Sequence, residues 1–168
     1  MTTSLQTLVD KQDITELIYR YCRSVDRLDE ALGYSIWHDD GIADYGDFYR
    51  GPGRGVIDLI CDNHRHTLHH SHQLANILIN VDGEQAGSEA YVTANLRVKQ
   101  GETTQQITVW TRYIDRWEKR DGRWGLVKRK ALRDFDEVRE VTPMSQPQSE
   151  GSRDRLDPSY SALNLFES

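Results

Sequence analysis

The second half of the chain alternates apolar and polar residues over long segments, which is the pattern of β-strands buried on one face. We expect strands over residues 72–81, 86–99, 107–119 and 124–134. Asp82-Gly83 and Asp121-Gly122 are hairpin-turn dipeptides, and Gly101 lies in the polar turn between the second and third strands. Strands joined by such short turns pair antiparallel with their sequence neighbours. The sequence therefore predicts an antiparallel meander of long strands.

Helical periodicity characterises the residues before this meander. We expect helices over residues 13–32, 31–38 and 54–67, and a further strand over 42–49. Asp13 and Glu16 have capping-box spacing at the start of the first helix, and Gly51-Pro52-Gly53 breaks the chain before the third. Helices followed by a run of antiparallel strands indicate an α+β fold, and 168 residues suit one domain.

Charge and cysteine content exclude several classes of protein. The chain carries 21 Lys and Arg against 27 Asp and Glu, a net charge of −6, which disfavours nucleic acid as the main partner. No segment approaches the roughly 18 apolar residues of a membrane helix, and no apolar run of signal-peptide type opens the chain. Cys22 and Cys61 lie far apart in helical patterns, so no disulfide framework is indicated and a cytoplasmic protein is expected.

The apolar content is low for a compact domain, with 37% hydrophobic residues and a mean hydropathy of −0.72. One source is the polar segment after residue 140, so we expect a catalytic domain over 1–140 and a C-terminal arm over 141–168. The arm regains apolar side chains near its end, at Tyr160, Leu163, Leu165 and Phe166. We therefore expect it to dock near the pocket or on a neighbouring subunit. The other source would be a partly polar interior.

Five of the six histidines lie between His64 and His72. A metal site would take His64 with His66, or His70 with His72, as ligands, but no third ligand follows at a defined spacing and no HExxH motif is present. His64 and His66 also fall near a polar helix end, where they would be solvated. We therefore expect no metal.

An acid–base site needs only one histidine at a strand end and one carboxylate from a helix packed on the sheet. Asp26 lies on or beside the apolar face of the first helix, and His72 begins the first long strand. The carboxylate would fix the tautomer of the imidazole, whose unperturbed pKa of ~6.5 suits proton transfer. The alternative is a solvated aspartate and an ordinary strand-end histidine.

Two arginines on the last strand could likewise belong to a functional pocket or to the surface. Arg129 and Arg133 would stabilise negative charge inside a pocket, or form a surface ladder with Asp115 or Glu118 across the hairpin. Aromatic residues that could line a pocket for a ring-bearing substrate, or simply fill the core, are Tyr45, Tyr49, Tyr91, Trp110 and Tyr113.

The segment from His72 to Ala86 resembles the H-x-x-x-N-x-x-I-x-V-D-G-D-x-A signature of SnoaL-like proteins, members of the nuclear transport factor 2-like superfamily. Residues 112–117 with Asp121-Gly122-Arg123-Trp124 resemble the strand pair that follows. Together with the first helix and residues 153–160, the resemblance covers roughly residues 8–160. It implies a cone-shaped α+β barrel, in which a curved, mostly antiparallel sheet closed by N-terminal helices surrounds a pocket.

The resemblance also implies site residues. Asp26 and His72 match the catalytic dyad of hexachlorocyclohexane dehydrochlorinase and bile acid 7α-dehydratase. Tyr21 and Arg133 match a helix tyrosine and a strand arginine of the bile acid enzyme, and Arg129 resembles an arginine of the dehydrochlorinase. Asp26, His72, Tyr21 and Arg133 would then be catalytic, mostly buried and facing one cavity.

The expected substrate-binding residues are Tyr45, Tyr49, Trp110, Arg129 and Tyr113. The bile acid enzyme has an aspartate where this chain has Ala94. Relatives in this branch, scytalone dehydratase among them, are cofactor-free lyases and typically homotrimers. The resemblance thus implies a cofactor-independent lyase of aromatic-compound catabolism that acts on a small ring-bearing substrate. Because some relatives release formaldehyde, the eliminated molecule would be water or formaldehyde. Alternatives are an isomerase or cyclase with the same dyad, a non-catalytic ligand-binding domain, and the small subunit of a ring-hydroxylating dioxygenase.

Overall fold

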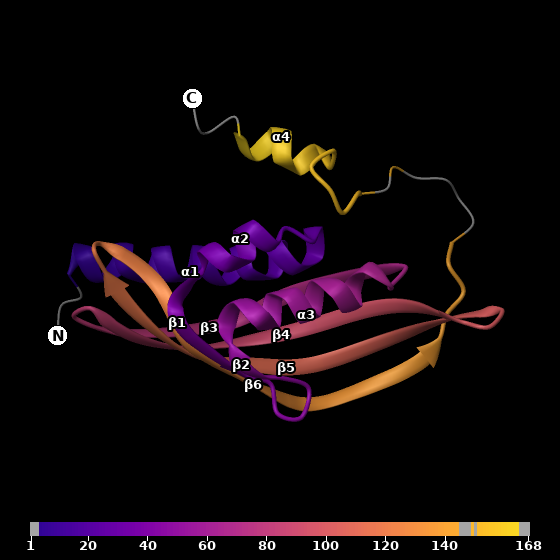
Figure 1. Ribbon diagram of the computed structural model, residues 1–168, viewed down its shortest axis with the longest axis horizontal. Coiled ribbons are helices and arrows are strands. Elements are labelled where there is room, and N and C mark those ends of the chain that lie inside the picture. Colours follow the sequence, from indigo (N-terminus) through magenta and orange to yellow (C-terminus); the bar gives the residue numbers. More distant parts are fainter. Residues whose placement is uncertain (1–3, 145–148, 150, 165–168) are drawn as a thin grey trace.

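The computed structural model describes residues 4–144, 149 and 151–164, which form helices packed on one curved sheet (Figure 1). The elements in chain order are α1 (Leu5–Arg27), α2 (Glu30–Ser35), β1 (Trp37–Asp44), β2 (Arg50–Pro52), α3 (Gly53–Arg65), β3 (His69–Asp82), β4 (Gln85–Gln100), β5 (Thr103–Arg120), β6 (Arg123–Glu140) and α4 (Pro158–Asn164). In this part of the chain the sheet has six strands in the order β2-β1-β6-β5-β4-β3.

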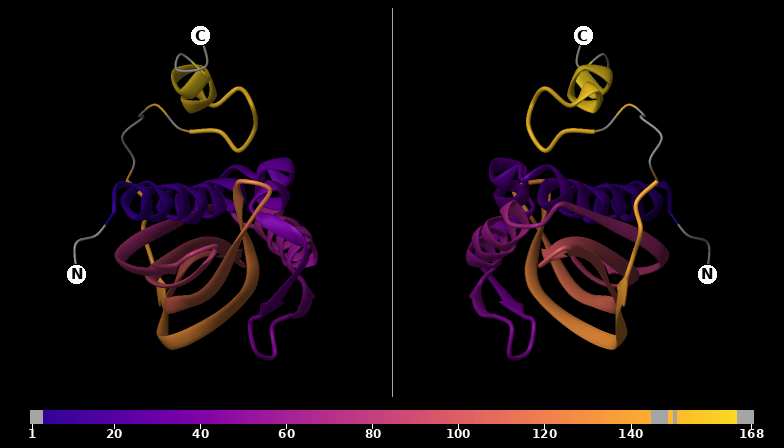
Figure 2. Two further views of the ribbon diagram at one scale, coloured as in Figure 1. Left: turned by 90° about the vertical axis from the view of Figure 1, so that its left-hand side faces the viewer. Right: turned by 90° about the vertical axis from the view of Figure 1, so that its right-hand side faces the viewer.

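The meander predicted from the alternating pattern is confirmed. Strands β3, β4, β5 and β6 pair antiparallel in sequence order, and β1 joins β6 in parallel. The sheet curls strongly, as the end-on views show (Figure 2). Among the described strands no hydrogen bonds join β2 to β3, so the cone is closed by α1 and α3 rather than by the sheet itself. The α+β cone is thus confirmed.

The helices bury one apolar face each against the concave side of the sheet. Buried side chains recur at helical spacing on α1 and α3 and meet the two tryptophans of the β5–β6 hairpin, at Ile14, Ile18, Val25, Val56, Ile57, Trp117 and Trp124. Burial of that apolar surface supplies most of the favourable free energy of folding.

The helix boundaries differ from those predicted. Helix α1 begins at Leu5 rather than residue 13, because Ser4 caps it and accepts a hydrogen bond from the backbone N–H of Thr7 at 3.1 Å. It ends at Arg27, because the next residue, Leu28, has a left-handed φ of 54°, so the predicted helix over 13–32 is interrupted there. Asp29 then caps α2 by accepting from the backbone N–H of Leu32.

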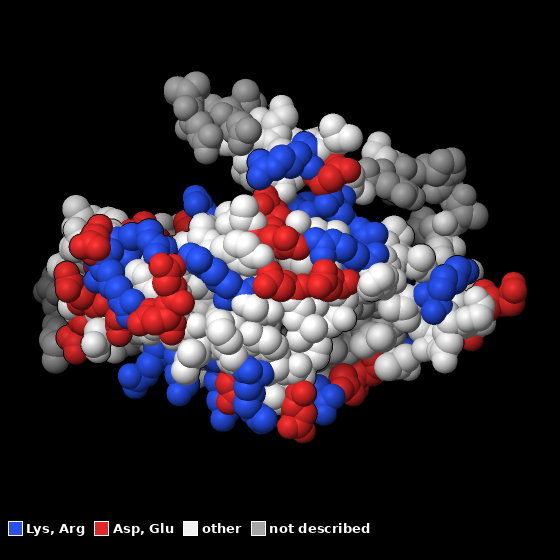
Figure 3. All heavy atoms as spheres, in the orientation of Figure 1, with Lys and Arg blue, Asp and Glu red and all other residues white. Residues whose placement is uncertain are grey.

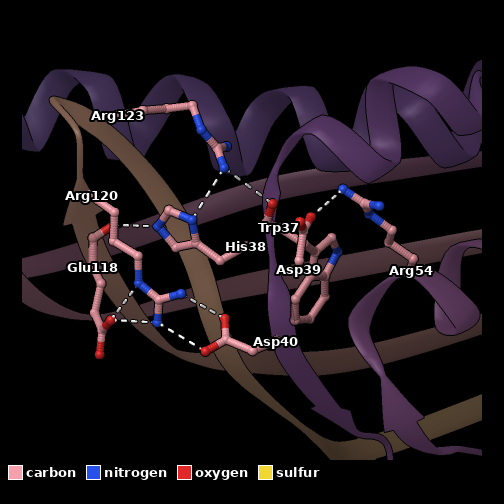
Figure 4. A network of polar contacts seen from close by, with 8 residues as sticks. All are labelled: Trp37, His38, Asp39, Asp40, Arg54, Glu118, Arg120 and Arg123. Atoms are coloured by element: carbon pink, nitrogen blue, oxygen red, sulfur yellow. Dashed lines mark hydrogen bonds and ion pairs between the residues drawn. The ribbon is translucent and has the colours of Figure 1, made fainter.

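A polar network fastens β1 to the β5–β6 hairpin (Figure 4). His38 is buried; its Nε2–H donates to the carbonyl of Glu118 at 2.9 Å, and its Nδ1 accepts from Arg123 at 3.1 Å. Arg120 pairs with Asp40 at 2.7 Å. These contacts hold β1 alongside β6, although the strands are distant in sequence.

The described part of the C-terminal arm lies against α1 and the end of α3 (Figure 1). Arg27 pairs with Asp157 at 3.1 Å, Arg153 donates to the carbonyl of His64 at 2.8 Å, and the Tyr160 hydroxyl donates to Asp29 at 2.9 Å. Leu165 and Phe166, which we expected to take part in docking, lie outside the described residues.

The surface carries both signs of charge. On the face shown in Figure 3, acidic and basic side chains are interspersed, as they are in the ion pairs of Arg54 with Asp39 and of Arg50 with Asp44. None of the helices in the described residues is long and apolar enough to cross a membrane.

Gly53 gives a test of the packing at the start of α3. A Cβ at Gly53 would lie 2.1 Å from Cε3 of Trp37, whose ring is buried. We expect Gly53→Ala to lower the free energy of unfolding by about 1–3 kcal/mol, measured by urea denaturation. Gly87→Ala is the control, because its Cβ would meet nothing closer than the Asp115 carbonyl at 4.0 Å. Equal stability of the two variants would contradict this packing.

Candidate active site

A cavity of about 690 Å³ lies between the concave face of the sheet and α3. Much of its wall is apolar, from Ile60 on α3 to Leu96, Ile107 and Val109 on β4 and β5. The wall residues with polar side chains are Tyr45, Asp47, His64, His72, Thr111, Tyr113 and Arg133. A mostly apolar cavity with a few polar groups is typical of a small-molecule site.

His72, on the wall of this cavity, makes a close polar contact with Asp26 of α1. The Nδ1 atom of His72 lies 2.7 Å from Oδ1 of Asp26, and the backbone N–H of His72 donates to Oδ2 at 3.0 Å. Their side chains are only 8% and 14% exposed. Because β3 is an edge strand, its outward N–H groups have no neighbouring strand to pair with. The Asp26 carboxylate therefore supplies a hydrogen-bond partner for one unpaired backbone N–H of this edge strand and also orients the imidazole.

The Asp26 carboxylate fixes the tautomer of His72. An ionised carboxylate only accepts hydrogen bonds, so Nδ1 carries the proton in the neutral ring and Nε2 keeps a lone pair. The ring lines the cavity. This arrangement can remove a proton from a bound molecule at Nε2 while Asp26 stabilises the imidazolium that forms.

Asp26 itself faces another hollow. A second cavity, of about 500 Å³, is lined by Asp26 with Arg23 and Arg27 of α1 and with Asp157 of the arm. His72 contributes to the walls of both cavities. The dyad therefore forms part of the partition between them.

Arg129 is fully buried. It forms a two-bonded ion pair with Asp115, at 2.8 Å from Nε to Oδ1 and 2.6 Å from Nη2 to Oδ2. Its guanidinium carbon lies 4.1 Å from the ring centre of Tyr21 and 3.9 Å from that of Tyr113. Burial raises the pKa of Asp115, and the charge of Arg129 opposes that shift. The predicted pairing with Asp115 is correct, but the surface location is wrong, and Arg129 does not line the main cavity.

Tyr21 lies in the core, behind the wall of the main cavity. It is fully buried, and its hydroxyl lies 2.7 Å from that of Tyr45, which does line the cavity. Burial raises the pKa of Tyr45, so its hydroxyl stays protonated and can donate a hydrogen bond. Tyr21 therefore supports Tyr45 from the core.

The other predicted residues divide between the cavity and the outside. Tyr113 lines the cavity, whereas Arg133 reaches it with a side chain 69% exposed and paired with Asp136 at 2.7 Å. Trp110 stacks on the exposed Phe135 at 4.6 Å between ring centres, and the Tyr49 hydroxyl donates to the carbonyl of Pro52.

These placements correct three expectations from the sequence. Asp26, His72, Tyr21 and Arg133 do not share one cavity, because Tyr21 is enclosed in the core and Asp26 faces the second hollow. Arg133 is not buried. Trp110 and Tyr49 do not line the main cavity, because the first lies on the outer face of β5 and the second packs over the start of α3.

The sequence expectation for His64 was also wrong. This histidine is 6% exposed and lines the cavity, rather than being solvated at a helix end. The signal was present, because His64 follows Ile57 and Ile60 at seven and four residues along the apolar face of α3. Burial lowers the pKa of His64 to about 3, and the nearby His70 and His72 add to the shift.

This depressed pKa predicts a loss of stability in acid. The unfolded histidine binds a proton near pH ~6.5, whereas the folded ring stays neutral down to about pH 3, so the contribution is complete above pH ~6.5 and is lost as the pH falls. Relative to His64→Asn, the free energy of unfolding of the wild type should fall by on the order of 1 kcal/mol per pH unit below pH ~6.5. Urea denaturation at several pH values measures this difference. A difference that does not change with pH would contradict a buried neutral ring.

Comparison with known proteins identifies the fold family. The model of the SnoaL-like domain matches residues 6–130. No curated protein sequence matches the chain significantly. The LinA-type3 hexachlorocyclohexane dehydrochlorinase from Novosphingobium barchaimii superimposes with a TM-score of 0.73 at 19% identity, over 88% of this chain and 100% of the other.

Two further solved structures share this architecture. A candidate scytalone dehydratase from Novosphingobium aromaticivorans gives a TM-score of 0.67 at 20% identity, over 84% of this chain and 97% of the other. The Kfla4162 protein from Kribbella flavida gives a TM-score of 0.70 at 17% identity, over 77% of this chain and 93% of the other. These likenesses concern the fold, and the family match extends over most of the chain. The protein belongs to the SnoaL-like family, whose domain model matches most of the chain.

Proposed function

We propose that this protein is a cofactor-independent lyase, which eliminates water or formaldehyde from a small ring-bearing substrate by acid–base catalysis at His72 and Asp26. The hydrogen bond between His72 Nδ1 and Asp26 Oδ1, beside a mostly apolar cavity, carries the proposal. The fold shared with a dehydrochlorinase and a candidate scytalone dehydratase supports the reaction class.

In a dehydration, Nε2 of His72 would take the proton from the carbon next to the one that bears the hydroxyl. The electrons of that C–H bond become the new double bond, and the C–O bond breaks. The imidazolium, stabilised by Asp26, then returns a proton to the leaving oxygen, so that water is released. In the release of formaldehyde, the same base would remove the O–H proton of a hydroxymethyl group, whose oxygen then forms the C=O bond of formaldehyde as the C–C bond breaks. The electrons of the broken C–C bond stay on the remaining carbon, which takes the proton back from the imidazolium.

Two further residues on the cavity wall suit the developing negative charge. The Tyr45 hydroxyl donates a hydrogen bond, and Arg133 at the mouth supplies a positive charge. Tyr21 would act as a positioning residue through its hydrogen bond to Tyr45. The apolar wall holds the ring and excludes water from the base.

We also propose a closed homo-oligomer, with a trimer as the expected form. Apolar side chains remain exposed on the strands β4 to β6, including Tyr91, Phe135 and Val138. Closed symmetric assemblies are the usual way in which such surfaces become covered. Light scattering of the purified protein measures the assembly directly.

The dyad predicts a loss of turnover in single variants. A panel of hydroxylated and hydroxymethyl-bearing aromatic compounds, followed by mass spectrometry and a formaldehyde assay, identifies a substrate for the wild type. With that substrate, His72→Ala and Asp26→Asn should each lower kcat by about 10²–10⁴-fold. Thermal unfolding should show that both variants fold.

His69→Ala is the matched control, because His69 is an exposed histidine on the same strand. Its turnover should equal that of the wild type. Near-normal turnover by His72→Ala would contradict the proposal. A product that retains every atom of the substrate would indicate an isomerase or cyclase that uses the same dyad.

A further inference from the structure

We propose that Asp157 of the C-terminal arm is a positioning residue for the dyad. Its ion pair with Arg27 of α1 neutralises a positive charge beside Asp26, which leaves the Asp26 carboxylate to His72. The inference rests on the proposed function in taking His72 as the base, and it gives the arm a role in setting the protonation of that base.

The ion pair and the dyad share the second cavity. Arg27 follows Asp26 directly in α1. Both dyad residues line this cavity of about 500 Å³, as do Arg27 and Asp157. An unbalanced arginine here would disfavour the imidazolium that forms when His72 takes a proton, and would compete with the imidazole for Asp26. Nη1 of Arg27 instead lies 3.1 Å from Oδ2 of Asp157, so its charge is balanced by the arm.

The carboxylate of Asp157 is held by the arm itself. It accepts hydrogen bonds from the hydroxyl of Ser159 and from the backbone N–H groups of Ser159 and Ser152, the latter two at 3.0 Å. The bonds from Ser159, with those from Ser152 and the charge of Arg27, lower the pKa of Asp157 to about 2. The carboxylate therefore stays ionised over the whole pH range in which a histidine titrates.

Further contacts place this part of the arm at the cavity. Arg153 donates to the carbonyl of His64 at 2.8 Å, and the hydroxyl of Tyr160 donates to Asp29 at 2.9 Å. One contact lies before Asp157 in the sequence and the other lies after it. Both remain when either member of the ion pair is replaced, so we expect the arm to stay docked in such variants.

Other titratable groups surround the dyad. On the second cavity they are Tyr19, Cys22 and Arg23 of α1. On the neighbouring elements they are His64 of α3, His70 of β3 and Arg153 of the arm. Across the main cavity they are Tyr45, Asp47, Tyr113 and Arg133. Because variants of the ion pair keep all of these groups, a difference between such variants reports the ion pair.

Titration of the His72 ring in the full-length protein tests the charge balance. Long-range ¹H–¹⁵N spectra of the histidine rings, assigned with His72→Ala, give the pH at the midpoint of its titration. Asp157→Asn leaves the charge of Arg27 unbalanced, so the midpoint should move to lower pH by about half a unit. Arg27→Gln leaves Asp157 unbalanced, so the midpoint should move to higher pH by about half a unit. The double variant removes both charges and should titrate within about 0.2 unit of the wild type.

Two matched controls separate charge from structure. Asp154→Asn makes the same substitution at an exposed carboxylate of the arm that lines neither cavity, and should leave the midpoint unchanged. Arg27→Lys keeps the positive charge and should titrate within about 0.2 unit of the wild type. If Asp157→Asn does not fold, the contrast between Arg27→Gln and Arg27→Lys decides the matter.

Shifts of the same sign in Asp157→Asn and Arg27→Gln would overturn the proposal, because loss of the arm contact, common to both variants, would then explain them. Unchanged midpoints in both variants would overturn it as well. The readout is protonation, so it is separate from turnover. If the expected shifts occur in a protein that catalyses no elimination, the proposed function fails and the effect of the ion pair on His72 remains. If a substrate is turned over, the acid limb of kcat/KM should move with each midpoint, and a limb that stays fixed would contradict the proposal.

Discussion

The contact between Asp26 and His72 joins the two parts of the molecule on which the cavity depends. Asp26 lies near the end of α1 and His72 near the start of the edge strand β3, and one carboxylate bonds both the imidazole and the backbone N–H. The helix thus covers an otherwise unpaired strand edge and orients a base toward the cavity. The same carboxylate thus stabilises the packing of α1 on β3 and orients the proposed catalytic base.

The low apolar content of the chain has a physical counterpart in the core. Beside the apolar residues, the fold buries the Arg129–Asp115 ion pair between the rings of Tyr21 and Tyr113. Buried charges are tolerated when they are paired and hydrogen-bonded, and removal of one partner would leave the other uncompensated. This polar core lies directly behind Tyr45 and gives that side of the cavity a rigid support.

The sequence was sufficient for the meander, because a period of two and the hairpin dipeptides are local signals. Asp26 and His72 were found from their places in the elements and from the family resemblance. The directions of Arg133 and Trp110 were not, because they depend on how the strands curl. The enclosure of Tyr21 was not either, because it depends on how α1 packs on the sheet. The pairing of β5 with β6 shifts register between Trp110 and Thr111, which moves side chains relative to a regular alternation. The burial of His64 was readable from the apolar face of α3, but its proximity to a polar helix end favoured the opposite interpretation.

The protonation of His72 tests the central claim most directly. Long-range ¹H–¹⁵N correlation spectra of the histidine rings distinguish the two neutral tautomers and can be assigned by comparison with His72→Ala. The account predicts that the neutral form of the His72 ring carries its proton at Nδ1 in the wild type, with that preference lost in Asp26→Asn. A wild-type His72 ring protonated at Nε2 would contradict the account, because no lone pair would then be available to take a proton in the cavity.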